Sequence, residues 1–229
     1  MFFDINYMIY MIPAFILMAL TSWYVRSSYS KWGKVPSRTG LTGAQAAKRL
    51  ISAGGLFGVQ IQGIAGEMTD NYDPRTKILN LSQGVASVSS VAAVAIAAHE
   101  LGHAMQDAEG YFPMRFRSAL VPAVNIGSSL GWIMILVGLF INRLELAWLG
   151  VMVFALGAVF ALATLPVEFN ASSRAKRLLF ESGIIADEEE RRGVNSVLNA
   201  AALTYVAALV TAILQVLYFA NLVGGRRRN

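Results

Sequence analysis

Four long segments without charged residues constrain this chain more than any other feature. Residues 5–25, 118–142, 146–167 and 193–223 contain no Asp, Glu, Lys or Arg. A helix needs about 20 apolar residues to cross the hydrocarbon core of a bilayer, and each segment is long enough. Because a helix satisfies its own backbone hydrogen bonds in lipid, we predict a mainly α, polytopic membrane protein with four transmembrane helices.

The composition agrees with a membrane protein and excludes several other classes. The chain is 55% hydrophobic and only 14% charged, which is too apolar for an ordinary soluble domain. It has no cysteine, so a disulfide framework, a Cys-ligated zinc finger and a thiol nucleophile are excluded. The basic residues lie mainly between the apolar segments, which is typical of membrane orientation rather than nucleic-acid binding. We therefore expect the lipid bilayer, and no nucleic acid, as a partner.

The region between the first two apolar segments has a mixed composition and predicts a small α+β domain. Thr42 and Gln45 have capping-box spacing at the start of a helix that Gly54-Gly55 ends. Residues 59–62 alternate like a strand, residues 71–74 favour a turn, and residues 76–81 favour a second strand. A free edge of this short sheet could hold an extended peptide, and the alternative is a plain structural hairpin.

One motif points to chemistry. A single helix is predicted at residues 82–109, and it carries the only two histidines, His99 and His103. Four residues apart on a helix, the two imidazoles project from one face and can bind one Zn²⁺. Glu100 beside them can take the proton of a water molecule. The alternative is a pair of histidines satisfied by local hydrogen bonds.

The third zinc ligand must be a carboxylate, because the chain has no further His and no Cys. Glu168, directly after the third apolar segment, is the best-placed candidate. The chain crosses the membrane twice between the motif and Glu168, so both lie on one side. The alternative is an interfacial carboxylate paired with Arg174 or Arg177.

The distribution of charge predicts which side this is. The side of the motif carries fifteen of the nineteen Lys and Arg residues, and the positive-inside rule places it in the cytoplasm. Three arginines at the C-terminus disagree. If residues 85–98 were a fifth span, these arginines would move inside, but that uncharged stretch is short for a bilayer and suits a buried core helix better.

Several motifs together resemble the YugP-like family of bacterial membrane zinc metallopeptidases. The resemblance covers nearly the whole chain and rests on residues 41–44 (LTGA), 70–74 (DNYDP), 81–82 (LS), 97–106 (AAHELGHAMQ), 165–172 (LPVEFNAS) and 199–205 (NAAALTY).

The resemblance implies one Zn²⁺ per chain held by His99, His103 and Glu168, with Glu100 as the general base. It also implies kinship with the gluzincin group, which includes the membrane protease HtpX. That group tends to carry an acidic residue after its ligand Glu that orients a ligand histidine, whereas this chain has Asn170 and Ser172 there. The turn often reads Asp-His-Tyr-Asp-Pro, and this chain has Asn71 at the second position.

These features predict a zinc endopeptidase of the bacterial inner membrane that hydrolyses membrane-associated proteins or peptides on the cytoplasmic side. Tyr72, Asn170 and Arg174 are candidate donors to the oxyanion of the transition state. One alternative is a site-2-type intramembrane metalloprotease, although the later Asp-Gly motif of those enzymes does not occur here. Another is a non-catalytic scaffold with a structural zinc whose fourth ligand is Glu67 or Asp70.

The predicted domain organisation follows from these interpretations: a first transmembrane anchor at 1–26, a metallopeptidase domain at 27–117 with the motif helix at 82–109, a transmembrane hairpin at 118–167, the third-ligand helix and loop at 168–192, and the fourth transmembrane helix with a basic tail at 193–229.

Overall fold

The structure is a computed structural model that describes residues 5–226. Residues 1–4 of the predicted anchor and residues 227–229 of the predicted basic tail lie outside the described residues. The chain forms two compact units, each built from segments that are far apart in the sequence. Among the described residues, the helical unit comprises residues 5–21, 115–166 and 204–226, and the mixed unit comprises Ser22–Met114 and Val167–Leu203.

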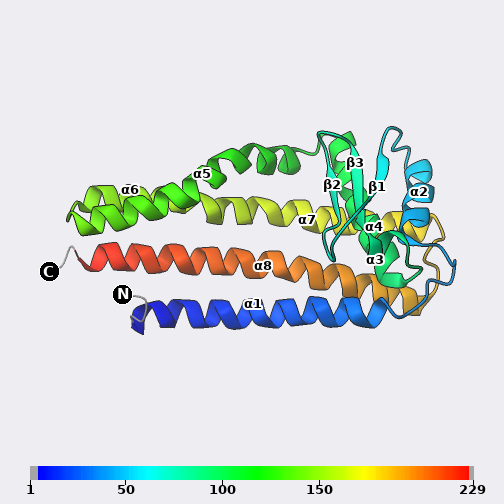
Figure 1. The fold of residues 1–229 in the computed structure, drawn as a ribbon, viewed down its shortest axis with the longest axis horizontal. Coiled ribbons are helices and arrows are strands. Elements are labelled where there is room, and N and C mark those ends of the chain that lie inside the picture. The colour runs from blue at the N-terminus through cyan, green and yellow to red at the C-terminus, as the bar shows by residue number, and fades with distance from the viewer. Residues whose placement is uncertain (1–4, 227–229) are drawn as a thin grey trace. The chain divides into compact units, whose positions relative to one another are not determined.

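Four helical stretches are long and apolar enough to cross a membrane (Figure 1). They are Ile5–Trp32 (α1), Phe112–Phe140 (α5), Leu144–Glu181 (α6 and α7) and Glu188–Gly225 (α8). Only 17% of the most apolar window of each stretch is buried inside the protein, and such extensive exposed apolar surface is typical of helices that face lipid. The predicted mainly α, polytopic fold is confirmed.

The helices extend beyond the predicted segments. α5 begins at Phe112, so Arg115 and Arg117 lie in its first turns. The third apolar segment contains two helices, α6 (Leu144–Phe154) and α7 (Leu156–Glu181), which meet at Ala155. The boundary predicted between residues 167 and 168 therefore falls inside α7, because the helical pattern continues from the apolar segment into the charged one.

The α5–α6 hairpin of the helical unit packs through small residues. An added Cβ at Gly131 would lie 2.6 Å from the Phe154 nitrogen, and one at Gly150 would lie 2.6 Å from the Ile135 nitrogen. Glycine at these positions lets the two backbones approach closely, which is how helices associate in lipid without a hydrophobic driving force.

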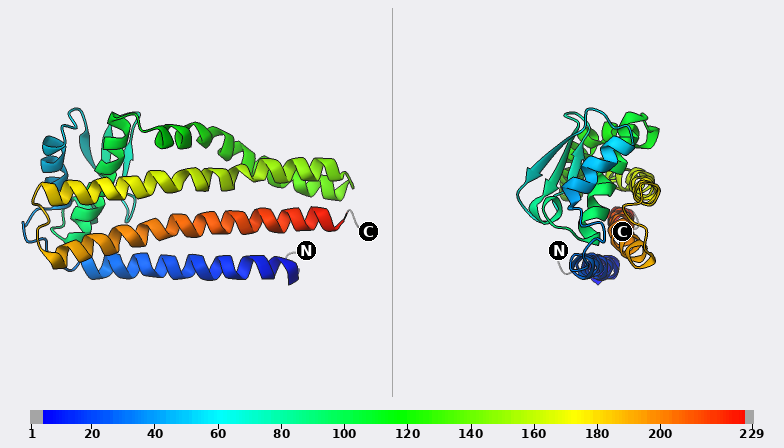
Figure 2. Two further views of the ribbon diagram at one scale, coloured as in Figure 1. Left: turned by 180° about the vertical axis from the view of Figure 1, so that it is seen from behind. Right: turned by 90° about the vertical axis from the view of Figure 1, so that its right-hand side faces the viewer.

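The mixed unit contains a three-stranded sheet (Figure 2). Its strands lie in the order β1-β3-β2 (Figure 1). β1 (Gln60–Ile64) pairs in parallel with β3 (Ile78–Ser82), so the alternative of a hairpin between these strands is wrong. Residues 71–73, predicted as part of a turn, form β2 (Asn71–Asp73), which pairs antiparallel with β3. The turn itself follows, where the Asp73 side chain accepts a hydrogen bond of 2.9 Å from the Arg75 amide.

The motif helix is shorter than predicted. The single helix at 82–109 is wrong, because α3 (Gln83–Ala86) ends before α4 (Val91–Ala108) begins. Ser90 caps α4 by accepting a hydrogen bond of 3.2 Å from the Ala93 amide. Serine competes with the helical backbone in this way and favours caps over helix interiors.

α4 forms the core of the mixed unit. Nearly all of its residues from Val91 to Ala98 are fully buried, and it packs against the sheet and against α2 (Gly43–Ala53), whose predicted capping box is present. α4 is not one of the four candidate spans of the described residues. Its small apolar side chains therefore serve a close-packed protein core, and the five-span alternative has no structural support.

We predict that Gly150→Ala destabilises the α5–α6 hairpin. The new methyl group would meet the backbone of Ile135 and Gly131, and overpacking of this kind costs about 1–3 kcal/mol. The thermal unfolding midpoint in detergent should fall by several degrees. Gly157→Ala is the control, because no atom lies within 4 Å of an added Cβ there. Equal midpoints for both variants would contradict the close approach of α5 and α6.

Candidate metal centre

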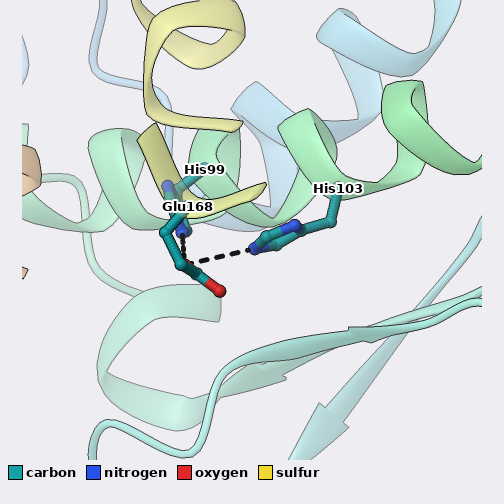
Figure 3. Close-up of side chains that lie close together, drawn as sticks. All are labelled: His99, His103 and Glu168. Atoms are coloured by element: carbon teal, nitrogen blue, oxygen red, sulfur yellow. Dashed lines mark hydrogen bonds and ion pairs between the residues drawn. The ribbon is translucent and has the colours of Figure 1, made fainter. Parts of the chain in front are cut away.

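Two helices of the mixed unit bring the three predicted metal ligands together (Figure 3). His99 and His103 lie on α4 and Glu168 lies on α7, and their ligand atoms are all within 4.8 Å of one another. The Glu168 Oε2 atom lies 3.3 Å from His99 Nε2 and 3.6 Å from His103 Nε2. The side chains of His99, His103 and Glu168 are only 12%, 11% and 3% exposed.

Gly102 allows α4 and α7 to lie close enough for this cluster to form. A Cβ added at Gly102 would lie 2.4 Å from the carbonyl oxygen of Ala171. Gly102 directly precedes His103, and Ala171 lies one turn after Glu168. The close approach of the two backbones at this point sets the distance between the imidazoles and the carboxylate.

Each imidazole is held at its second nitrogen. The Nδ1 atom of His99 lies 3.1 Å from Ser172 Oγ, and the Nδ1 atom of His103 lies 3.0 Å from Gln106 Oε1. Both rings therefore present Nε2 to Glu168. Contacts to the outer nitrogen are the usual way in which proteins orient a metal-binding histidine.

Gln106 has no predicted role, although the sequence contains a signal for one. It lies three residues after His103, which places it on the same face of α4. Its side chain is completely buried, and its Nε2 atom donates hydrogen bonds of 2.8 Å to the Val167 carbonyl oxygen and 3.0 Å to Asn170 Oδ1.

The three side chains predicted as oxyanion donors each form hydrogen bonds within the protein. Tyr72 donates its hydroxyl to Asp107 Oδ2 at 2.8 Å. Arg174 donates to Asn170 Oδ1 at 2.6 Å and forms a two-pronged ion pair with Glu109 at 2.6 and 2.7 Å. Tyr72 and Arg174 therefore already donate to protein acceptors, whereas Asn170 accepts through Oδ1. The oxyanion role of these three residues stays a prediction.

Glu100 lies between the two histidines in sequence and is partly buried. Burial raises the pKa of its carboxyl group, an effect that the nearby imidazoles oppose and that Glu168 and Asp70 reinforce. Burial alone would lower the pKa of His103, but hydrogen bonding to Glu168 and the charges of Glu100 and Glu168 raise it overall. Acidic and basic groups are thus concentrated in one buried cluster.

The donor set fits a zinc ion. Two imidazole nitrogens and one carboxylate oxygen are a known ligand set for zinc sites that keep one position open. Between residues 5 and 226, no further His, Cys, Asp or Glu belongs to the group. Asp70 instead accepts hydrogen bonds from the amide and hydroxyl of Ser82, at 2.7 and 3.0 Å, and Glu67 is exposed. Neither of the predicted fourth ligands, Glu67 or Asp70, therefore belongs to this group of described residues.

We predict that Gly102→Ala separates α4 from α7 and weakens metal binding. The backbone of Ala171 must move to accommodate the methyl group, which shifts the segment that carries Glu168. Both the thermal midpoint and the zinc content of the purified protein should fall. In the same unit, Gly63→Ala meets no atom within 4 Å and should change neither quantity. Unchanged zinc content in Gly102→Ala would contradict the role of this contact.

Comparison with known proteins agrees with this centre. The family model described as "Putative neutral zinc metallopeptidase" matches residues 7–224. "Putative membrane protease YugP" of Bacillus subtilis (strain 168) is 41% identical over 206 residues, which cover 90% of this chain and 91% of that protein. No solved structure matches the chain. This membrane protein therefore belongs to the YugP-like family, whose model carries the description "Putative neutral zinc metallopeptidase".

Proposed function

We propose that this chain is a zinc-dependent endopeptidase of the gluzincin type, with one zinc ion held by His99, His103 and Glu168. The observation that carries the proposal is the convergence of these side chains from α4 and α7 in a buried cluster of three ligands. Three protein ligands leave a fourth position for water and substrate, as in catalytic zinc sites.

Zinc, when bound, supplies Lewis-acid polarisation of the scissile carbonyl and lowers the pKa of a water molecule to about 7. Glu100 accepts the proton of the attacking water and passes it to the nitrogen of the leaving amine. A group that acts first as a base and then as an acid works best with a pKa near the working pH. The burial that raises the pKa of Glu100 moves it in this direction.

The substrates that we propose are membrane-associated proteins or peptides. The metal ligand Glu168 lies in the same apolar helical stretch as the third candidate span, Leu144–Glu181. A site tied to a membrane segment in this way suits polypeptides held at the bilayer surface. The two alternatives have lost support, since a site-2-type enzyme requires the motif helix to be a span, and a structural zinc requires a fourth ligand.

We further propose that the protein lies in the bacterial inner membrane with the site facing the cytoplasm. Ten Lys and Arg residues between Arg26 and Arg117, and five between Arg174 and Arg192, lie on the side of the site in a four-span topology. Positively charged segments are retained in the cytoplasm during membrane insertion.

Replacing Glu100 with Gln tests the reaction. The amide cannot accept the proton of water, so we expect cleavage of an unfolded protein substrate to fall by about 10²- to 10⁴-fold. Zinc content should stay at that of the wild type, because Glu100 is not one of the three ligands. The exposed Glu67→Gln serves as the control and should keep full activity. An active Glu100→Gln variant would refute Glu100 as the base.

The absence of cysteine makes the predicted orientation directly testable by single-cysteine labelling. Glu67 in the mixed unit and Arg143 in the α5–α6 turn are both exposed and are predicted to lie on opposite sides of the membrane. With a membrane-impermeant maleimide on intact spheroplasts, Arg143→Cys should be labelled and Glu67→Cys should react only after lysis. The reverse pattern would place the site outside the cytoplasm.

A further inference from the structure

A chain of hydrogen bonds runs from the protein surface to the outer nitrogen of His103. Glu109, whose side chain is 54% exposed, binds both terminal nitrogens of Arg174. The Arg174 Nε atom donates to Asn170 Oδ1 at 2.6 Å, and Gln106 Nε2 donates to the same oxygen at 3.0 Å. Gln106 Oε1 then lies 3.0 Å from His103 Nδ1.

The direction of these hydrogen bonds is fixed because some of the groups can only donate and others can only accept. A guanidinium group has donors and no acceptor, so the Asn170 atom that faces Arg174 must be the oxygen. The Asn170 oxygen and the carbonyl oxygen of Val167 are both acceptors, so the Gln106 amide must direct its NH₂ group to these two oxygens. Gln106 must therefore present its oxygen to His103.

An amide oxygen can only accept a hydrogen bond, so Nδ1 of His103 must carry a proton. In the neutral imidazole this leaves the lone pair on Nε2, the nitrogen that lies 3.6 Å from Glu168 Oε2. We propose that Gln106, Asn170, Arg174 and Glu109 are positioning residues that hold His103 in its metal-binding tautomer. The inference rests on the proposed zinc site.

The two histidines differ in this respect. Ser172, which lies 3.1 Å from His99 Nδ1, carries a hydroxyl group that can either donate or accept. It orients the His99 ring without imposing a tautomer. Within residues 5–226, this chain of hydrogen bonds connects His103 to a guanidinium group, which can only donate.

The burial of each residue predicts how strongly its substitution should weaken zinc binding along this chain of hydrogen bonds. Gln106 is completely buried, so the loss of its partners leaves polar groups unsatisfied where water does not compensate for them. Arg174 has a 12% exposed side chain and also lies 5.8 Å from the Tyr111 ring, which keeps it in place if Glu109 is lost. Substitutions should therefore matter most at Gln106 and least at Glu109.

A pair of substitutions at Asn170 tests the proposal in the purified full-length protein. In Asn170→Asp, a carboxylate oxygen can still accept from both Arg174 and Gln106, whereas Asn170→Leu removes the acceptor. Loss of a group that orients a metal ligand typically weakens metal binding about 10- to 100-fold. We expect this loss, measured by competition with a chelator, in Asn170→Leu and Gln106→Leu but not in Asn170→Asp. The absorption spectrum of the Co²⁺-substituted protein should change in the same two variants.

Asn199→Leu is the matched control, because Asn199 is exposed and its oxygen accepts a hydrogen bond of 3.0 Å from Lys176 on the protein surface. It should bind zinc like the wild type. Wild-type zinc affinity in Asn170→Leu, or an equal loss in Asn170→Asp and Asn170→Leu, would overturn the proposal. If Gln106→Leu does not fold, the comparison at Asn170 decides alone.

A failure of the positioning proposal can be distinguished from a failure of the proposed function, because zinc affinity is measured without a substrate. An active Glu100→Gln variant would refute the peptidase mechanism and leave the affinity series intact. A wild-type protein that binds zinc and cleaves substrate, together with unaffected affinity in Asn170→Leu, would refute only the positioning role.

Discussion

The contact between Gly102 on α4 and Ala171 on α7 is the constraint on which the rest of the site depends. Helices normally lie 8–10 Å apart, at a distance set by the side chains between them. Here the absence of a side chain lets the carbonyl of Ala171 reach the α4 backbone. Glu168 lies one turn before Ala171 on α7, and His103 directly follows Gly102 on α4, so the same approach places Glu168 beside both imidazoles.

This arrangement explains how a very apolar chain can bury so many polar groups. An isolated buried carboxylate is costly, but Glu168 lies against two imidazoles, which are each hydrogen-bonded at their other nitrogen. Around them, α4 supplies small apolar residues such as Ala97 and Ala98, which are completely buried. The polar cluster therefore occupies one face of a helix that is otherwise a hydrophobic core.

The parts of the structure that were predictable from sequence are those with a local signal. The four-residue spacing of His99 and His103, the capping box of α2 and the uncharged segments each depend on neighbouring residues. Glu168 was found in a different way, by excluding every other ligand type and then counting membrane crossings. The structure places it within 4.8 Å of the histidine ligand atoms.

The remaining features depend on contacts between distant segments, or on a short sequence pattern that lies within a longer and more conspicuous one. The parallel pairing of β1 with β3 has no signature in either strand, and residues 71–73 contain the Asn and Asp that favour turns. Because residues 85–98 are uninterrupted by charge, they favour one continuous helix, and the helix cap at Ser90 was not predicted. The role of Gln106 is visible only when Val167 and Asn170 are brought to it by α7.

X-ray absorption at the zinc edge of the purified protein tests the central claim most directly. The account predicts a four-coordinate zinc with two imidazole nitrogens and two oxygen ligands, one of them from Glu168 and one from solvent. In Glu168→Ala, one protein oxygen ligand should be lost and the affinity should fall. A zinc ion with four protein ligands, or a coordination shell that is unchanged in Glu168→Ala, would contradict it.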